Sequence, residues 1–131
     1  TGRVPSASRT EWDRPRRPHR LIGVGLDDGS LRERIDARTR AMLAGGWIDE
    51  VRSILGTTGF GPTSSQALGY PEVRAHLAGT LDLESLATRI ATRTWRFSRR
   101  QLTWYRRLGG VEWLDPTATN AIERALGALD E

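Results

Sequence analysis

The sequence predicts a mostly helical α/β protein with one modest core and two short strands. Helical patterns follow one another through residues 31–108, whereas residues 21–26 and 111–115 are short apolar runs beside turn residues. The chain has 131 residues, of which 37% are hydrophobic and 27% charged, as is typical of globular domains. Because two isolated short strands do not make an independent sheet, we expect them to complete a larger parallel sheet.

Residues 1–20 are expected to be a basic connecting segment rich in proline and arginine. Pro5, Pro15 and Pro18 lack the amide hydrogen that helices and sheets both use. The chain also begins without methionine, and we interpret this segment as a link between two parts of a longer protein. A basic tail that adds nonspecific affinity for RNA or DNA is the alternative. Residues 21–131 then form the folded portion.

Turn and capping residues set the limits of the expected elements. Asp27 to Ser30 can cap a helix, Gly45-Gly46 can end it, and Pro71 suits a first helical turn. Asp49 and Glu50 suit the positive end of a helix dipole. The expected order is a strand over 21–26, helices over 31–44 and 47–55, a loop over 56–65, a helix near Pro71, a long helix from Thr80 or Asp82 to about Leu108, a strand over 111–115 and a helix over 119–129.

The long helix carries a row of arginines beside an apolar stripe. At about 100° per residue, five arginines fall within roughly 60° of one another: Arg89, Arg93, Arg96, Arg100 and Arg107. The stripe, turned from them by about 80°, consists of Leu86, Ile90, Phe97, Trp104 and Leu108. Like charges at four-residue spacing repel, yet no Asp or Glu lies between Arg89 and Arg107. We interpret the row as a surface for a polyanion; an ordinary solvated face is the alternative.

Arg38 is the most unusual residue of the first helix. It falls near the centre of the apolar face that Leu31, Ile35 and Met42 define. An unpaired buried charge is costly, so this arginine needs compensation. One interpretation is that its planar fork binds a phosphate or pyrophosphate in a cleft. The alternative is an arginine that reaches out of the core or pairs with a structural carboxylate, and the pattern alone favours neither.

Composition favours an anionic partner. The net charge is +4, the isoelectric point is near 10.8, and all 20 basic residues are arginine. The absence of cysteine excludes disulfides, thiolate metal sites and cysteine nucleophiles, and His19 and His76 lack the neighbours of a metal site. No apolar run has membrane-spanning length, so the cytoplasm is the expected compartment. We expect Trp47, Trp104 and Trp113 to lie in the core.

Three stretches together resemble the second half of the tRNA dimethylallyltransferase (isopentenyltransferase) family: RIDARTRAMLAGGWIDEVRSIL, SSQALGYPEV and FSRRQLTWYRRLGGVEWLD. The similarity covers about residues 1–115 and keeps the order and approximate spacing of the family's segments. The matches that carry it are Arg34-Ile35 with Arg38, Gly46 with Glu50-Val51, Gly69-Tyr70, Arg100-Gln101 with Trp104, and Trp113-Leu114-Asp115.

The resemblance implies a P-loop-kinase-like fold, with residues 21–131 as the carboxyl-terminal part of the catalytic domain. It also implies transfer of a dimethylallyl group from dimethylallyl diphosphate to N6 of the adenosine immediately 3′ of the anticodon in tRNA. The family's phosphate loop and general-base aspartate lie in its first half, and this sequence has no G-x-x-x-x-G-K-[ST] motif. We therefore expect the Mg²⁺ ligands and the base to lie outside this chain, which alone would be inactive, and we expect a monomer with no membrane partner.

The resemblance also assigns roles to individual residues. Arg38 matches the family arginine that faces the diphosphate, where it would stabilise the charge on the departing pyrophosphate. Two segments match positions that contact the anticodon stem-loop, and their chemistry suits an RNA loop, which proteins bind through stacking and phosphate contacts. The tRNA-binding assignments are Thr63, Ser64, Ser65, Gln66, Arg93, Thr94, Trp95, Arg96, Arg99, Arg100 and Gln101.

Two positions depart from the family pattern. Trp95 stands where family members usually carry arginine, which leaves the RNA contacts there open. Pro71 stands where many members have a basic residue, which suggests one fewer phosphate contact. A second class of function also stays open, a noncatalytic basic helical module that binds structured RNA. A P-loop sequence upstream in the reading frame would favour the enzyme.

Overall fold

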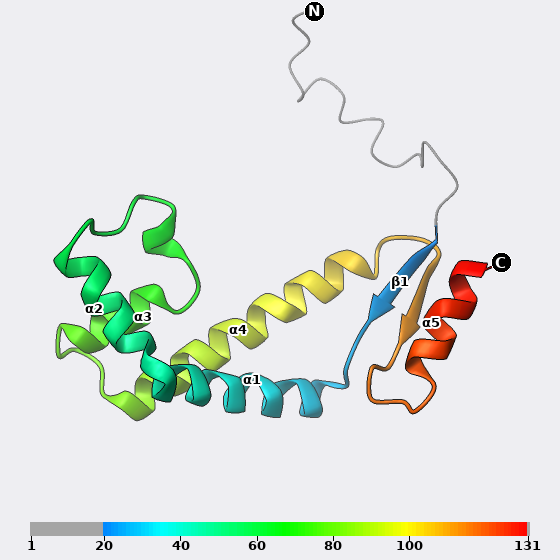
Figure 1. The fold of residues 1–131 in the computed structure, drawn as a ribbon, viewed down its shortest axis with the longest axis horizontal. Coiled ribbons are helices and arrows are strands. Elements are labelled where there is room, and N and C mark those ends of the chain that lie inside the picture. Colours follow the sequence, from blue (N-terminus) through cyan, green and yellow to red (C-terminus); the bar gives the residue numbers. More distant parts are fainter. Residues whose placement is uncertain (1–19, 131) are drawn as a thin grey trace, which may run out of the picture. The chain divides into compact units, whose positions relative to one another are not determined.

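The computed structural model describes residues 20–130, with side chains up to residue 127. These residues divide into a helical unit, Leu26–Arg107, and a strand unit made of residues 20–25 and 108–130. The predicted order of strands and helices is confirmed (Figure 1). The connecting segment expected over residues 1–20 lies, except for Arg20, outside the described residues, and so does His19.

The strand unit consists of β1 (Leu21–Val24), β2 (Val111–Leu114) and α5 (Ala121–Asp130). The two strands pair with each other in parallel, with Leu21 opposite Val111, and this parallel orientation agrees with the expected sheet. Gly23 is needed in β1, because a Cβ at this position would lie 2.7 Å from the Trp113 ring. Trp113 itself is 36% exposed, so the prediction that it lies in the core is wrong.

The helical unit consists of α1 (Asp28–Met42), the π-helical turn η2 (Leu43–Trp47), α2 (Ile48–Gly56), the 3-10 turn η3 (Ser64–Gln66), α3 (Tyr70–Leu77) and α4 (Leu83–Tyr105). Side-chain caps fix the first residues of the two long helices, α1 and α4. The side chain of Asp27 accepts a hydrogen bond from the Ser30 backbone N–H at 3.0 Å, so α1 begins earlier than predicted. Asp82 accepts from the backbone and the hydroxyl of Ser85, at 2.8 and 2.6 Å, and thereby starts α4.

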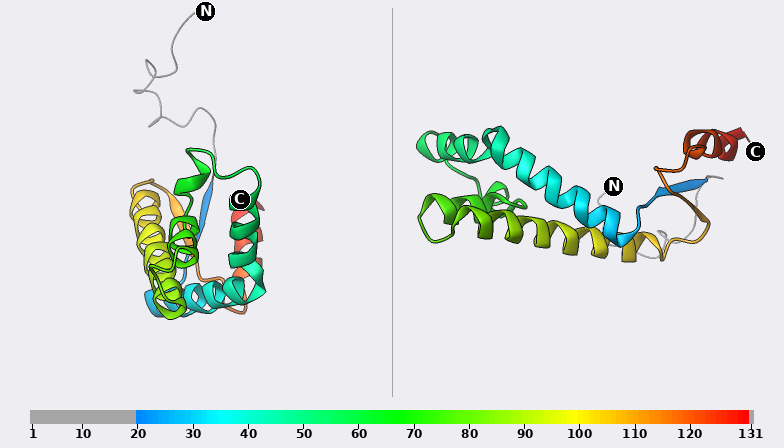
Figure 2. Two further views of the ribbon diagram at one scale, coloured as in Figure 1. Left: turned by 90° about the vertical axis from the view of Figure 1, so that its left-hand side faces the viewer. Right: turned by 90° about the horizontal axis from the view of Figure 1, so that it is seen from below.

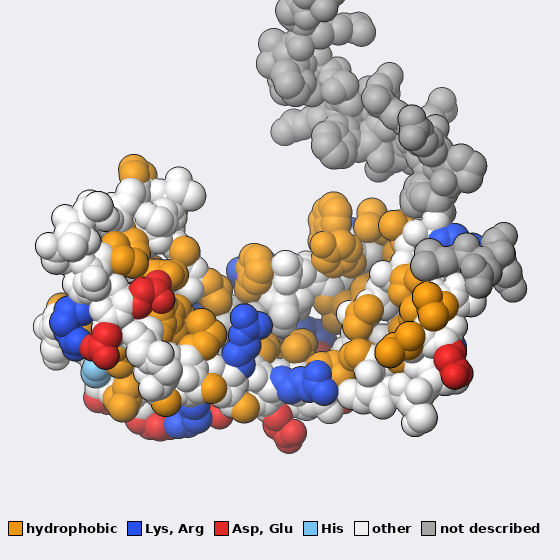
Figure 3. Space-filling view, in the orientation of Figure 1, with side chains coloured by type: hydrophobic (Ala, Val, Ile, Leu, Met, Phe, Trp, Pro, Cys, Tyr) orange, Lys and Arg blue, Asp and Glu red, His pale blue; other side chains and the backbone are white. Residues whose placement is uncertain are grey.

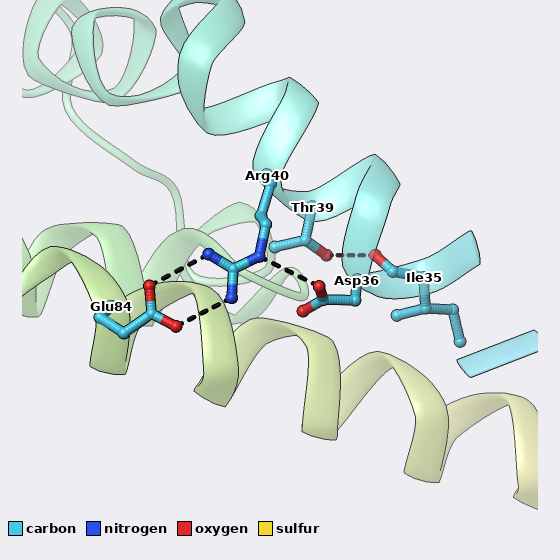
Figure 4. Close-up of polar contacts among 5 residues, drawn as sticks. All are labelled: Ile35, Asp36, Thr39, Arg40 and Glu84. Carbon is cyan, nitrogen blue, oxygen red and sulfur yellow. Dashed lines mark hydrogen bonds and ion pairs between the residues drawn. The ribbon is translucent and has the colours of Figure 1, made fainter. Parts of the chain in front are cut away.

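Helices α1 and α4 lie side by side and run in opposite directions (Figure 2). Near one end Arg99 donates to both oxygens of Asp28, at 2.6 and 2.8 Å. Near the other end Arg40 donates to both oxygens of Glu84, at 3.0 and 2.8 Å, and to Asp36 of its own helix, at 3.0 Å (Figure 4). The two ion pairs join the start of each helix to the later part of the other, which fixes the antiparallel register.

The chain turns between α1 and α2 at Gly46. This residue has a φ of 99°, which lies in the region that residues with a Cβ rarely adopt. The prediction that Gly45-Gly46 ends the first helix is therefore confirmed. The turn brings Trp47 into the core and directs α2 back toward α3.

The core of the helical unit lies where α2 packs on α3 and α3 packs on the first half of α4. Its buried members are Trp47, Val51, Val73, Leu81, Leu86 and Ile90. The predicted apolar stripe of α4 is buried only in this half. Further along the helix, Phe97 is 45% exposed and Trp104 58% exposed, so the prediction that Trp104 lies in the core is wrong.

Candidate functional site

A cleft of about 710 Å³ opens between α1, η2, α2, α3 and α4, all within the helical unit. Its walls are mixed. Ile35, Met42 and Ile90 contribute apolar surface, whereas Arg38 and Glu50 contribute opposite charges. Basic side chains at the surface over α1 stand beside hydrophobic ones (Figure 3). An apolar cavity with a few polar groups is the usual form of a small-molecule site.

Arg38 lines this cleft and forms no ion pair with any residue in the described part of the chain. The alternative that it pairs with a structural carboxylate is therefore wrong for residues 20–130. The predicted position at the centre of an apolar face is also wrong. The buried positions of α1 are Ile35 and Thr39, so the buried face is turned toward Thr39 and Arg38 lies at its edge. Thr39 tolerates burial because its hydroxyl donates to the Ile35 carbonyl at 2.8 Å.

Tyr70 and Glu50 form a hydrogen-bonded pair at the same cleft. The Tyr70 hydroxyl donates to Glu50 Oε1 at 2.9 Å, and this bond, together with burial, raises the pKa of Tyr70 above its ordinary value. The Tyr70 ring also packs edge-on against Trp47, with ring centroids 5.8 Å apart. Sequence reasoning assigned Glu50 only to the helix dipole and missed this pair, because its two members are 20 residues apart.

Gly69 allows the chain to pass close to Trp47 at the start of α3. Its φ is 92°, and a Cβ at this position would overlap the Trp47 ring. No other residue type fits both conditions. The close approach holds the segment that follows η3 against the core.

The structure brings only one of the predicted tRNA-binding residues to the cleft of Arg38. Thr94 lines that cleft, and its hydroxyl donates to the Ile90 carbonyl at 2.8 Å. Thr63 to Gln66 lie instead at η3, where all but the partly buried Ser65 are exposed. The loop containing η3 then leads through Leu68 and Tyr70 into the cleft.

The arginines of α4 fall into two groups. Arg93 pairs with Glu72 of α3, and Arg99 pairs with Asp28 of α1. Arg96 and Arg100 form no ion pair with any described residue, and the Arg100 guanidinium lies 5.7 Å from the Phe97 ring centroid. The partnered arginines have part of their charge compensated within the protein, and the unpartnered ones do not.

Trp95 lies on the side of α4 that faces α1. Its ring is flanked by the guanidinium groups of Arg32 and Arg99, 4.5 and 5.9 Å from the ring centroid. Its indole N–H is buried without a hydrogen-bond partner. Gln101, the last predicted position on this helix, is exposed. The predicted RNA-binding residues thus occupy more than one face of α4.

Comparison with known proteins decides the family. The model of the IPP transferase family matches residues 1–108. The chain belongs to the IPP transferase family. A curated relative, the tRNA dimethylallyltransferase of Symbiobacterium thermophilum, is 41% identical over 126 residues, which are 95% of this chain. The protein of the same name from Bifidobacterium animalis subsp. lactis is 37% identical over 113 residues, or 86% of the chain.

Solved structures of the family share the fold. The chain superposes on the tRNA isopentenylpyrophosphate transferase of Bacillus halodurans with a TM-score of 0.74, at 29% identity, over 85% of this chain and 39% of that protein. The corresponding protein of Staphylococcus epidermidis gives the same TM-score at 25% identity, over 84% of this chain and 36% of that one. The mostly helical α/β arrangement predicted above is therefore the arrangement of IPP transferases.

The match covers only part of the length of these relatives. The chain spans 40% of the Symbiobacterium protein and 32% of the Bifidobacterium protein. Within the described residues, no helix is long and apolar enough to cross a membrane.

Proposed function

We propose that the full-length protein is a tRNA dimethylallyltransferase, which moves a dimethylallyl group from dimethylallyl diphosphate to N6 of the adenosine immediately 3′ of the anticodon. The observation that carries the proposal is Arg38, a cation that lines a cleft and has no carboxylate partner among the described residues, in a chain of the IPP transferase family. The curated relatives that match this chain bear the name of this activity.

The chemistry explains why such a cation is useful. The lone pair of N6 forms a bond to C1 of the dimethylallyl group, and the bond from C1 to the diphosphate oxygen breaks. Pyrophosphate leaves with the electron pair of that bond, and the N6 proton passes to a base that the family resemblance assigns to a part of the enzyme outside this chain. Negative charge grows on the leaving oxygen as the bond breaks. Arg38 would therefore stabilise the transition state more than the bound substrate.

We also propose that η3 and α4 contact the anticodon stem-loop. Arg96 and Arg100 suit phosphate oxygens, because no described carboxylate neutralises them. Gln66 on η3 can donate to and accept from a base edge. The reactive adenine must leave its stack to reach the cleft. The loop from η3 to Tyr70 joins the proposed RNA contact at η3 to this cleft.

Other requirements of the reaction fall outside the described residues. These residues contain no group of three His, Cys, Asp or Glu side chains that could hold a metal ion, so no step here is assigned to Mg²⁺. We propose that the family's Mg²⁺ is held elsewhere in the full-length protein. We also propose that the enzyme acts in the cytoplasm, where tRNA is available, as a monomer.

The decisive experiment measures incorporation of radiolabelled dimethylallyl groups into tRNA by the full-length protein. We expect incorporation into transcripts with adenosine 3′ of the anticodon, and none when that nucleotide is guanosine. Binding of tRNA without any incorporation would instead favour the noncatalytic RNA-binding module, which the unpaired arginines of α4 would also serve.

A further inference from the structure

Glu72 is the one charged side chain that is buried within the described part of the chain. Only 8% of the residue is exposed, and it lies in the first turn of α3, one position after Pro71. The positive end of a helix dipole favours a carboxylate at this place. Burial nevertheless removes the water that a carboxylate would otherwise bind, so the protein must supply partners in its place.

The partners supplied to Glu72 are incomplete. Its Oε1 accepts a hydrogen bond from the guanidinium of Arg93 on α4, whereas its Oε2 is buried without any hydrogen-bond partner. A buried carboxylate with one oxygen unpartnered costs stability, because nothing offsets the loss of water from that oxygen. Stability alone therefore does not account for a carboxylate at this position.

Arg93 differs from its neighbours in the arginine row. Its side chain is 45% exposed, while one of its terminal nitrogens is bonded to Glu72. Arg96 and Arg100 are also exposed but have no carboxylate partner among the described residues. A free arginine loses rotamer entropy when it is fixed on a ligand, whereas an arginine already held by a carboxylate has lost part of that freedom before the ligand arrives.

We propose that Glu72 is a positioning residue, which holds the Arg93 guanidinium so that its remaining N–H groups point outward to a phosphate of the tRNA. This inference rests on the proposed function, because it requires that α4 meets tRNA. Glu72 itself does not touch the RNA. It contributes by fixing Arg93, the arginine of the row that pairs with a carboxylate of α3.

The test uses the full-length protein with Glu72→Gln, because the sign of the effect separates two explanations. The substitution removes a negative charge near the RNA-binding face, so a purely electrostatic role predicts tighter tRNA binding. A positioning role predicts weaker binding, about tenfold in Kd, with a salt slope smaller in magnitude by somewhat under one unit, as for one lost phosphate contact. Turnover at saturating tRNA should stay unchanged.

The matched control is Glu84→Gln, which makes the same charge change on α4 and frees Arg40, an arginine outside the predicted RNA contacts. We expect its tRNA affinity to be unchanged or slightly increased. The double variant Glu72→Gln with Arg93→Gln should bind no more weakly than Arg93→Gln alone, since the two residues act through one contact. Additive losses would overturn the positioning role.

Folding and the parent proposal are checked separately. If Glu72→Gln lowers the melting temperature too far for binding assays, the Glu72→Asp variant is used in its place. A positioning role predicts weaker tRNA binding by this variant, because the shorter side chain draws the guanidinium back. Unchanged binding would overturn the positioning role. A protein without substitutions that neither binds nor modifies tRNA would overturn the proposed function. An active protein in which Glu72→Gln leaves Kd and salt slope unchanged would overturn only this inference.

Discussion

Replacing Arg38 with glutamine removes a positive charge from the cleft but keeps an amide that can donate hydrogen bonds. The residue is exposed in the middle of α1 and has no ion pair among the described residues. Arginine and glutamine have similar helix propensities, and a surface substitution of this kind changes stability by less than about 0.5 kcal/mol. In a domain of this size the melting temperature should move by no more than about 4 °C.

The chemical step should respond much more strongly. Loss of one fixed donor to a developing oxyanion usually lowers the rate about 10²–10³-fold, or by roughly 2.7–4 kcal/mol. We therefore expect single-turnover transfer by the full-length Arg38→Gln protein to fall at least a hundredfold. Dimethylallyl diphosphate should also bind more weakly, because Arg38 would hold the phosphates of the ground state as well. Affinity for tRNA should stay the same.

Arg40→Gln provides the control, since it makes the same charge change two positions later on the same helix. Arg40 is held by Glu84 and Asp36 rather than facing the cleft. Its replacement should lower the melting temperature slightly and leave turnover intact, the reverse of the Arg38 pattern. A clear loss of stability with normal single-turnover rate in Arg38→Gln would refute the catalytic assignment and show that the arginine is structural.

Three further outcomes are expected. The 131-residue chain alone should transfer no labelled dimethylallyl group to tRNA, because it lacks the phosphate loop of the family; incorporation above a protein-free control would contradict this. In the full-length protein, Arg96→Gln should weaken tRNA binding and reduce the salt slope by somewhat under one unit, whereas Arg40→Gln, outside the predicted RNA contacts, should leave the slope unchanged; equal slopes for both variants would count against the RNA-binding row. Gly69→Ala should lower the free energy of unfolding by about 2 kcal/mol or more, from the positive φ and the overlap with Trp47, which denaturant titration can measure.

Sequence reasoning succeeded where structure is decided by near neighbours. Asp27 and Asp82 cap helices through residues three positions away, and Gly46 turns the chain through its own φ angle. These signals are complete within a few residues, so the positions of the helices could be predicted. The cleft was only half predicted: Arg38 could be singled out, but not that Thr94 and Tyr70 would line the same space.

Pairs of distant residues could not be predicted. The partners of Arg93 and Arg99 lie 21 and 71 residues away in sequence, and no local pattern indicates which helices will meet. The absence of acidic residues between Arg89 and Arg107 indicated a row of free arginines. Carboxylates from α1 and α3 pair with some of these arginines, so the charges of the row are compensated to different degrees, which its sequence does not indicate.

The length of the neighbouring helices explains two differences between α4 and its prediction, the exposed second half of its apolar stripe and the unequal pairing of its arginines. At 1.5 Å per residue, α4 with its 23 residues is about 34 Å long, whereas α3 with eight residues covers about 12 Å of it. Periodicity shows which face of a helix is apolar but not how far a neighbour extends along it. Burial therefore ends after Ile90, leaving Phe97 exposed. The same limit governs the arginines, because α3 can offer a carboxylate to Arg93 but not to Arg100, two turns further on, whose charge stays available to an external anion.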